Sequence, residues 1–284
     1  MIKKLLIISA LLVGIMIPAT AQERNQIFRL HVDPLTYVEP SNNNSVGAIM
    51  GTLAQAASGQ TTNNRHPEVV PYINAVVKAT FSDVRRLSTV EDAAQYTLQG
   101  DIIEISTWTK SRTKESKDSK GRVTKTVITD YYASTAVSLT LTDNETGESW
   151  THKFTGGGNT YYYFTSEAAA IESALNSMQG KIVDYYNNLF PLTAQIVDKG
   201  KENKDKINEV YIDLGSEAGV HKGLHFNVSV MGETAGRATE HKIGKIKIQE
   251  VQGPEISLCK VEKGKKEIKQ ALDEGVPLII KSIY

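Results

Sequence analysis

Cysteine is almost absent from this chain of 284 residues. Cys259 is the only one, so no intrachain disulfide can form, and the fold must be stabilised by burial of apolar side chains. The chain is long enough for one large domain or two modest ones. Cys259 lies in an apolar, strand-like run at residues 256–261, where a small buried thiol needs no further role.

An excess of charge of either sign is also missing. The chain has 32 Lys and Arg residues against 32 Asp and Glu residues. Removal of Lys3 and Lys4 with a signal segment would leave 30 basic residues against 32 acidic ones, a net charge of −2. This balance predicts neither nucleic-acid binding nor general attraction to a membrane surface.

One long apolar run is present, at residues 5–17. Lys3 and Lys4 precede it and Ala19-Thr20-Ala21 follows it, which is the pattern of a secretory signal. The run is shorter than the roughly 20 residues of a membrane-spanning helix, although a retained anchor helix is the alternative. No cysteine lies directly after it, so a lipid anchor of the bacterial lipoprotein type has no acceptor. We therefore expect a signal peptide over residues 1–21, a mature chain that starts at Gln22, and a periplasmic or secreted protein.

Catalytic motifs are missing as well. The sequence contains no Gly-x-Ser-x-Gly, no Walker phosphate loop and no His-Glu-x-x-His. His221 and His225 have the only ligand-like histidine spacing, but they lie on a turn into a strand, whereas that spacing brings ligands together on a helix. Glycines 156–158 precede a helix and could hold a phosphate, although the tyrosines after them and the lack of a nearby lysine favour a plain hinge. We expect no catalytic site, no cofactor and no metal.

Residues 22–192 have the pattern of an α/β module. Strands are expected over 27–32, 84–87, 96–105, 102–113, 123–142 and 150–154, and helices over 46–57, from Pro67 to residue 81, and from Ser166 to Asn188. Residues 59–67 are polar and predicted to be loose. The two long strands form a hairpin with Gly121 at its tip.

The pattern changes after Leu192. Six strand-like runs and one short helix, at residues 266–272, follow within about 90 residues, which predicts a small closed barrel over residues 193–284. The chain as a whole is therefore expected to be α+β, a mixed sheet with a long hairpin followed by a β-barrel domain.

The run VYIDLGSEAGVHKG, residues 210–223, is the most informative part of this second region. Val210, Ile212 and Leu214 alternate with polar residues, as in a half-buried strand. Gly215, Gly219 and Gly223 then form a structural turn, because glycine adopts positive φ without strain.

These C-terminal residues resemble the last domain of the flagellar assembly protein T family. The matching stretches are residues 190–191, 194–197, 210–212, 214–216, 219–223, 243–246 and 257–261, with Phe226. The resemblance covers about 90 residues and implies an SH3-like barrel behind an α/β module.

The first region is similar to the α/β module shared by the curli secretion channel and the lipoprotein activators of penicillin-binding proteins. Residues 93–102 (AAQYTLQGDI) and 158–190 carry this similarity. The chain departs from both groups because it lacks the lipid-bearing cysteine, and its first helical region is unusually small and apolar.

The hairpin around residues 110–125 has the strongest local bias of charge. Lys114, Lys117, Lys120 and Arg122 lie around its tip and are the candidate partner contacts, although a solvated hairpin without a partner is the simpler alternative.

We expect a non-catalytic envelope assembly or accessory protein that binds unidentified envelope proteins, without a transmembrane segment after signal removal, and oligomerisation is possible. The alternative is a subunit of an outer-membrane secretion channel of the curli type. That function would require strands with an unbroken apolar face of roughly 9–11 residues, and neither face of the hairpin arm at residues 107–113 has one. A third class, a wall-degrading or wall-binding enzyme, lacks a catalytic constellation.

Overall fold

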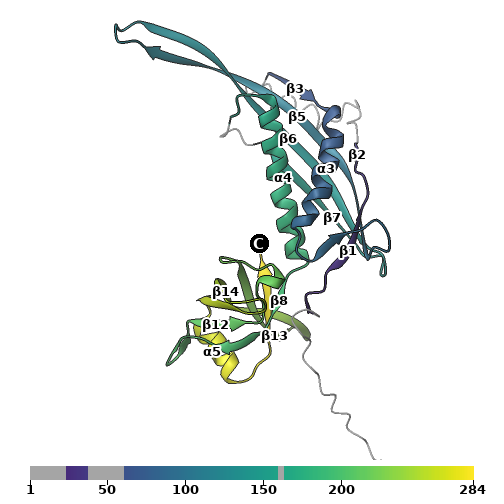
Figure 1. The fold of residues 1–284 in the computed structure, drawn as a ribbon, viewed down its shortest axis with the longest axis vertical. Coiled ribbons are helices and arrows are strands. Elements are labelled where there is room, and N and C mark those ends of the chain that lie inside the picture. Colours follow the sequence, from purple (N-terminus) through teal and green to yellow (C-terminus); the bar gives the residue numbers. More distant parts are fainter. Residues whose placement is uncertain (1–23, 38–60, 159–162) are drawn as a thin grey trace, which may run out of the picture.

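The computed structural model describes residues 24–37, 61–158 and 163–284, which form two units with a sheet each (Figure 1). The predicted signal segment and the predicted helix at residues 46–57 lie outside the described residues. The first sheet has the strand order β4-β1-β5-β6-β7, with β2 and β3 also paired to β5. The second has the order β8-β16-β13-β14-β15-β12-β9, and a small β10-β11 pair stands apart. The chain is thus mixed α+β, as expected.

The elements of the first unit alternate between short strands, two helices and three long strands. They are β1 (Phe28–Val32), β2 (Thr36–Tyr37), β3 (Thr61–Arg65), the 3-10 helix η1 (Pro67–Val69), α3 (Val70–Thr80), the 3-10 helix η2 (Phe81–Asp83), β4 (Leu87–Thr89), β5 (Tyr96–Lys117), β6 (Val123–Asp143), β7 (Ser149–Gly157) and α4 (Glu167–Leu189).

The first sheet is mixed because β1 runs parallel to β4 and β5, whereas β6 is antiparallel to both of its neighbours, β5 and β7. Helices α3 and α4 cover one face of this sheet (Figure 1). The core between them contains Leu98 and Leu139 from the sheet with Ile73 and Ile182 from the helices. The α4 start agrees with the sequence, since the Ser166 hydroxyl accepts a hydrogen bond from the amide of Ala169 and caps the helix.

Three predictions for this unit need correction. Residues 61–65, expected to be loose, form strand β3, whose backbone pairs with Ser106–Thr109 of β5; a polar segment can do this because ladder bonds use main-chain groups only. The strand expected at 84–87 begins three residues later, as β4. The strand expected to start at 102 is continuous with the preceding one from Tyr96.

The glycines predicted to form a hinge are packing positions instead. Gly156 and Gly157 belong to β7 and pair with β6. A Cβ at Gly156 would lie 1.9 Å from the carbonyl oxygen of Ala174 in α4, and one at Gly157 would lie 2.0 Å from the carbonyl oxygen of Ala133. Glycine is therefore required because the strand approaches the helix and its neighbour closely.

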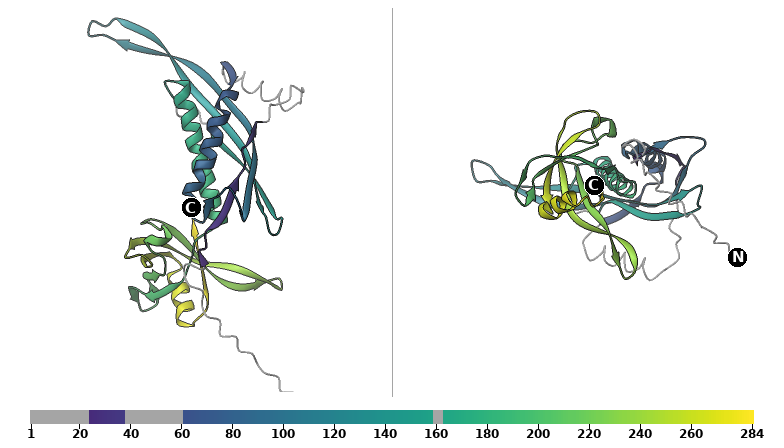
Figure 2. Two further views of the ribbon diagram at one scale, coloured as in Figure 1. Left: turned by 45° about the vertical axis from the view of Figure 1, so that its right-hand side comes forward. Right: turned by 90° about the horizontal axis from the view of Figure 1, so that it is seen from below.

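The second unit is a nearly closed antiparallel sheet with one helix. Its elements are β8 (Thr193–Ala194), β9 (Ile196–Lys199), β10 (Glu202–Asn203), β11 (Lys206–Ile207), β12 (Glu209–Ile212), the 3-10 helix η3 (Ser216–Ala218), β13 (His225–Thr234), β14 (Arg237–Val251), β15 (Ser257–Lys263), α5 (Lys265–Asp273) and β16 (Leu278–Ile283). The barrel-like architecture agrees with the sequence. The β13-β14 hairpin stays paired out to Thr234 and Arg237 and projects from the side of the unit (Figure 2).

The two units have separate apolar cores. The first core runs from Leu30 to Tyr186, and the second from Leu192 to Ile280, with Cys259 inside it. Polar contacts join the units: Asn188 of α4 accepts a hydrogen bond from the amide of Tyr284 at 3.1 Å, and the amide of Thr193 donates to Asn25 at 2.7 Å. The division of the chain into domains between residues 192 and 193 stays a prediction. Within the described residues, no helix is both long and apolar enough for a membrane crossing.

Candidate functional site

The outer part of the β5-β6 hairpin, residues 110–130, is here called the ribbon. It projects beyond the ends of α3 and α4 as a twisted pair of strands (Figure 1). Strand β5 is exposed from Ser111 to Lys117, and β6 is exposed from Val123 to Val127. No helix of the described residues lies over the ribbon, which is therefore an exposed arm of the sheet.

The two faces of the ribbon differ in chemistry. Thr107, whose hydroxyl contacts Glu167 of α4, marks the face that the helices cover. Because side chains alternate along a strand, the same face of the ribbon carries Val123 and Val127, which are 46% and 70% exposed. The opposite face carries Lys110, Arg112 and Lys114. One side is thus partly apolar and the other is basic.

A single carboxylate organises the tip. The Oδ1 atom of Asp118 accepts hydrogen bonds from the amides of Lys120 and Arg122, both at 2.9 Å. Gly121 takes the left-handed conformation there, with φ of 78°. Hydrogen bonds from the Arg122 backbone amide and side chain lower the pKa of Asp118. The tip is therefore a defined turn.

The four predicted contact residues have two different roles. Arg122 donates to Asp118 at 2.8 Å and so belongs to the turn itself. Lys114, Lys117 and Lys120 are exposed and have no carboxylate partner within the parts of the chain that the structure describes. The structure thus leaves three lysines available around the tip.

Aromatic rings and an ion pair hold the base of the ribbon. Trp108 and Tyr132 stack with ring centroids 5.7 Å apart, and the Lys110 ammonium lies 5.6 Å from the Tyr132 centroid. Arg112 donates to Asp130 at 2.7 Å, a hydrogen bond that raises the pKa of Arg112. Two of the basic side chains near the base are therefore already engaged.

The predicted glycine turn lies in the second unit, beside the first. Gly219 and Gly223 have φ of 67° and 98°, as expected, and Val220 between them is buried. Gly215 has an ordinary φ of −133°, but a Cβ there would lie 2.2 Å from the carbonyl oxygen of Gly253. A Cβ at Gly219 would lie 3.1 Å from the Arg85 guanidinium, so the turn also faces the first unit.

The two histidines with ligand-like spacing contact different groups. His225 lies 3.3 Å from a carboxylate oxygen of Glu262, and desolvation lowers its pKa. The ring of His221 contacts the carbonyl oxygen of Lys222. No group of three or more His, Cys, Asp or Glu side chains is placed to hold a metal ion within residues 24–37, 61–158 and 163–284.

A histidine that the sequence did not single out lies at a junction of three elements. The Nδ1 atom of His66 is 2.8 Å from Glu68, and its Nε2 atom is 2.8 Å from the Thr107 hydroxyl and 3.3 Å from Glu167. The Thr107 hydroxyl donates its hydrogen bond to Glu167. It therefore does not donate to His66, as a nucleophilic hydroxyl would donate to its general base. The cluster joins the starts of α3 and α4 to β5, and no spacing in the sequence indicates it.

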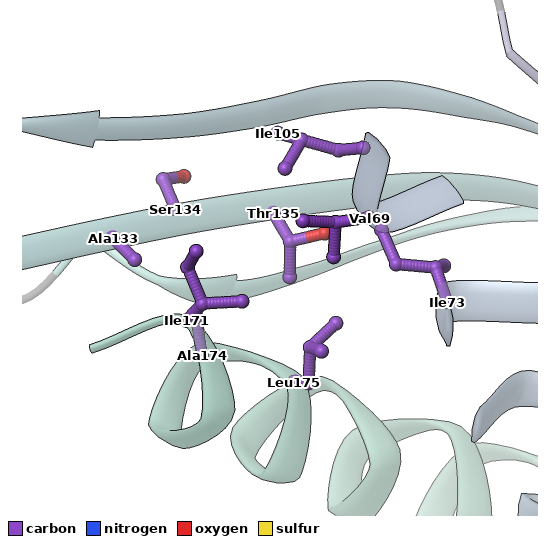
Figure 3. A pocket seen from close by; sticks show the side chains of 9 residues that line it. All are labelled: Val69, Ile73, Ile105, Ala133, Ser134, Thr135, Ile171, Ala174 and Leu175. Atoms are coloured by element: carbon purple, nitrogen blue, oxygen red, sulfur yellow. The ribbon is translucent and has the colours of Figure 1, made fainter. Parts of the chain in front are cut away.

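A small cavity lies between the sheet and the helices (Figure 3). Its wall is apolar apart from the hydroxyls of Ser134 and Thr135. Thr135 is 2% exposed, and its hydroxyl finds no hydrogen-bond partner in the described part of the chain. The space does not admit a water molecule, so it is a packing defect and not a ligand site.

Comparison with known proteins does not add an assignment: no protein-family model matches the chain, and no curated protein matches it.

Proposed function

We propose that this chain is an exported, non-catalytic accessory or assembly protein of the cell envelope, periplasmic or secreted, that acts through contacts with other proteins. The observation that carries the proposal is the ribbon. It places Lys114, Lys117 and Lys120 on an exposed arm, without carboxylate partners among the described residues. A solvated arm of this kind contributes little to folding, whereas it attracts an acidic partner surface and steers its association.

The finer fold comparison is part of the same proposal. The nearly closed sheet of the second unit, with its glycine turn, supports an SH3-like barrel of the flagellar assembly protein T kind. The two helices on a mixed sheet support a first unit similar to the module of the curli channel and the penicillin-binding-protein activators. Both resemblances imply docking to larger assemblies.

The alternative, a subunit of a curli-type secretion channel, has one observation in its favour. Strands β5 and β6 have 22 and 21 residues, which is far longer than the usual 5–6 residues of a strand in a globular protein. However, the basic face with Lys110, Arg112 and Lys114 opposes contact with lipid. The docking function is therefore the one that we put forward.

The test measures how much envelope protein two triple variants and the wild type capture. Captured proteins are cross-linked and identified by mass spectrometry at low and at high salt. The first variant changes Lys114, Lys117 and Lys120 to Ser. The matched control changes Lys201, Lys204 and Lys266, which are exposed lysines of the second unit, to Ser.

We expect the ribbon variant to lose capture at low salt, the control to keep it, and high salt to weaken capture by the wild type. Unchanged capture by the ribbon variant would refute the proposal. Arg122 is left in place because its bond to Asp118 shapes the tip.

A further inference from the structure

The free edge of β6 shows how a partner could bind the ribbon. At its base, Tyr131 exchanges two backbone hydrogen bonds with Phe164, at 2.9 and 3.2 Å. Its amide and carbonyl therefore point away from β5. Because hydrogen-bonded and non-bonded pairs alternate in an antiparallel ladder, the backbone groups of Thr129, Val127, Lys125 and Val123 point outward in the same way.

The described chain leaves this edge at the base of the ribbon. Phe164 runs antiparallel to β6, so the residues after it would continue along the edge toward the tip. Ser166 instead caps α4, and Glu167 begins the helix. No described residue pairs with β6 between Val123 and Asp130 other than those of β5. As far as the described chain goes, the outward backbone groups there form an unpaired strand edge beside the sheet.

The side chains along this edge suit an extended segment. Val123 and Val127 lie on one face and offer apolar surface to a β-branched or aromatic neighbour. Thr124 and Thr126 lie on the other face, and the second of them is opposite Lys114 of β5. These threonines are short, so a glutamate on an added strand can reach Lys114 across them.

The charge of the ribbon favours an acidic partner over a second copy of this chain as the molecule that binds the β6 edge. The ribbon has seven basic residues, namely Lys110, Arg112, Lys114, Lys117, Lys120, Arg122 and Lys125. It has three acidic ones, Glu115, Asp118 and Asp130, which gives a net charge of +4. Two ribbons side by side would repel each other, whereas an acidic strand would be attracted.

We propose that the outer edge of β6, residues 123–129, binds an extended acidic segment of a partner protein by strand addition. The inference rests on the proposed docking function and specifies its geometry: main-chain hydrogen bonds give affinity, and the alternating side chains give selectivity. Addition of a third strand would also stabilise the arm, since an isolated two-stranded ribbon is marginal in water.

The test uses a fluorescent peptide, Glu-Val-Glu-Thr-Glu-Val-Glu with blocked ends, and two proline variants of the full protein. Val127→Pro removes an outward amide from the β6 edge, and Thr113→Pro removes the corresponding amide from the outer edge of β5, because these residues are opposite each other. Neither amide takes part in the β5-β6 ladder, so the two strands of the ribbon should stay paired in both variants. Amide exchange of β5 and β6 will show whether they do.

We expect Val127→Pro to lower the affinity for the peptide about tenfold or more, because it blocks the central backbone hydrogen bonds. Thr113→Pro should change this affinity less than about twofold. A peptide that is N-methylated at alternate residues tests the same backbone hydrogen bonds without a change in the protein. It should bind the wild type as weakly as the unmodified peptide binds Val127→Pro. Equal affinity of wild type and Val127→Pro, equal loss in both proline variants with an intact ribbon, or no binding of the peptide would overturn strand addition.

The outcomes separate this inference from the proposed function. If the triple lysine variant loses envelope capture while Val127→Pro keeps it, the ribbon docks through its charges alone and strand addition is wrong. If the triple lysine variant keeps capture, the docking function itself is wrong.

Discussion

Replacement of Gly219 by alanine should destabilise the second unit through backbone conformation. Gly219 has φ of 67° and ψ of 16°, a left-handed conformation that costs a residue with a Cβ roughly 1–2 kcal/mol. The nearest atom to an added Cβ is the guanidinium of Arg85, 3.1 Å away. Because that group ends a flexible side chain, steric strain should add little, and the dihedral cost should account for the change in the free energy of unfolding.

Two further glycines test this explanation. Gly215→Ala should also destabilise, by about 1–3 kcal/mol, but for a steric reason, since its Cβ would meet the backbone of Gly253 and Pro254 at 2.2–2.4 Å. Gly180→Ala in α4 is the opposite control. Its Cβ would meet no atom within 4 Å, and alanine favours a helix by about 1 kcal/mol over glycine, so this variant should be more stable.

The assay must separate the two units. Both tryptophans, Trp108 in β5 and Trp150 in β7, lie in the first unit. Urea titration followed by tryptophan fluorescence therefore reports the first sheet, and amide exchange of peptides from β12 and β13 reports the second. We expect Gly219→Ala to accelerate exchange in β12 and β13 and to leave the fluorescence midpoint nearly unchanged.

An unchanged exchange rate in Gly219→Ala would show that the left-handed conformation does not limit stability there, and the reasoning would fail. Equal shifts of fluorescence and exchange would show that the two units unfold together through the contacts of Asn188 with Tyr284 and of Asn25 with Thr193.

Two other changes follow from single polar groups. Thr135→Val should raise the free energy of unfolding by about 1 kcal/mol or more, because it removes a buried hydroxyl without a partner among the described residues. Thr80→Val is the matched control and should not raise the free energy of unfolding, since the buried Thr80 hydroxyl donates to the carbonyl of Val76 at 2.7 Å. A loss of stability in Thr135→Val, measured by urea titration, would contradict the argument. The lowered pKa of Asp118 means that its carboxylate stabilises the tip above the pKa of an unfolded aspartate, and that this contribution is lost as the pH falls through the folded pKa. Amide exchange of Lys120 and Arg122 should therefore accelerate on acidification relative to Lys125, whose amide points outward at every pH, and Asp118→Ala should abolish the difference.

Sequence patterns predicted the elements whose stability depends on nearby residues. Alternation of apolar and polar residues identified β12, periodicity located α3, and Ser166 marked the start of α4. These features could be found because a strand buries every second residue, a helix buries one stripe, and a cap uses a residue three positions away.

The sequence located the four basic residues of the candidate contact, and their contact with a partner stays a prediction. These residues do lie around the tip of the hairpin, because they are neighbours in the sequence. Residue type did not reveal that these four side chains have different roles. Side-chain geometry shows that Arg122 belongs to the turn with Asp118, whereas the three lysines have no carboxylate partner among the described residues.

By itself, then, the sequence determined that a mixed sheet with a long hairpin precedes a barrel-like sheet, and that Gly219 and Gly223 need positive φ. The tertiary structure alone decided that a polar segment pairs as β3, that Gly156 admits the close approach of α4, and that the outer edge of β6 is vacant where the described chain departs at Phe164. The physical reason is that strand pairing uses backbone groups common to every residue, and that close packing depends on atoms far apart in the chain.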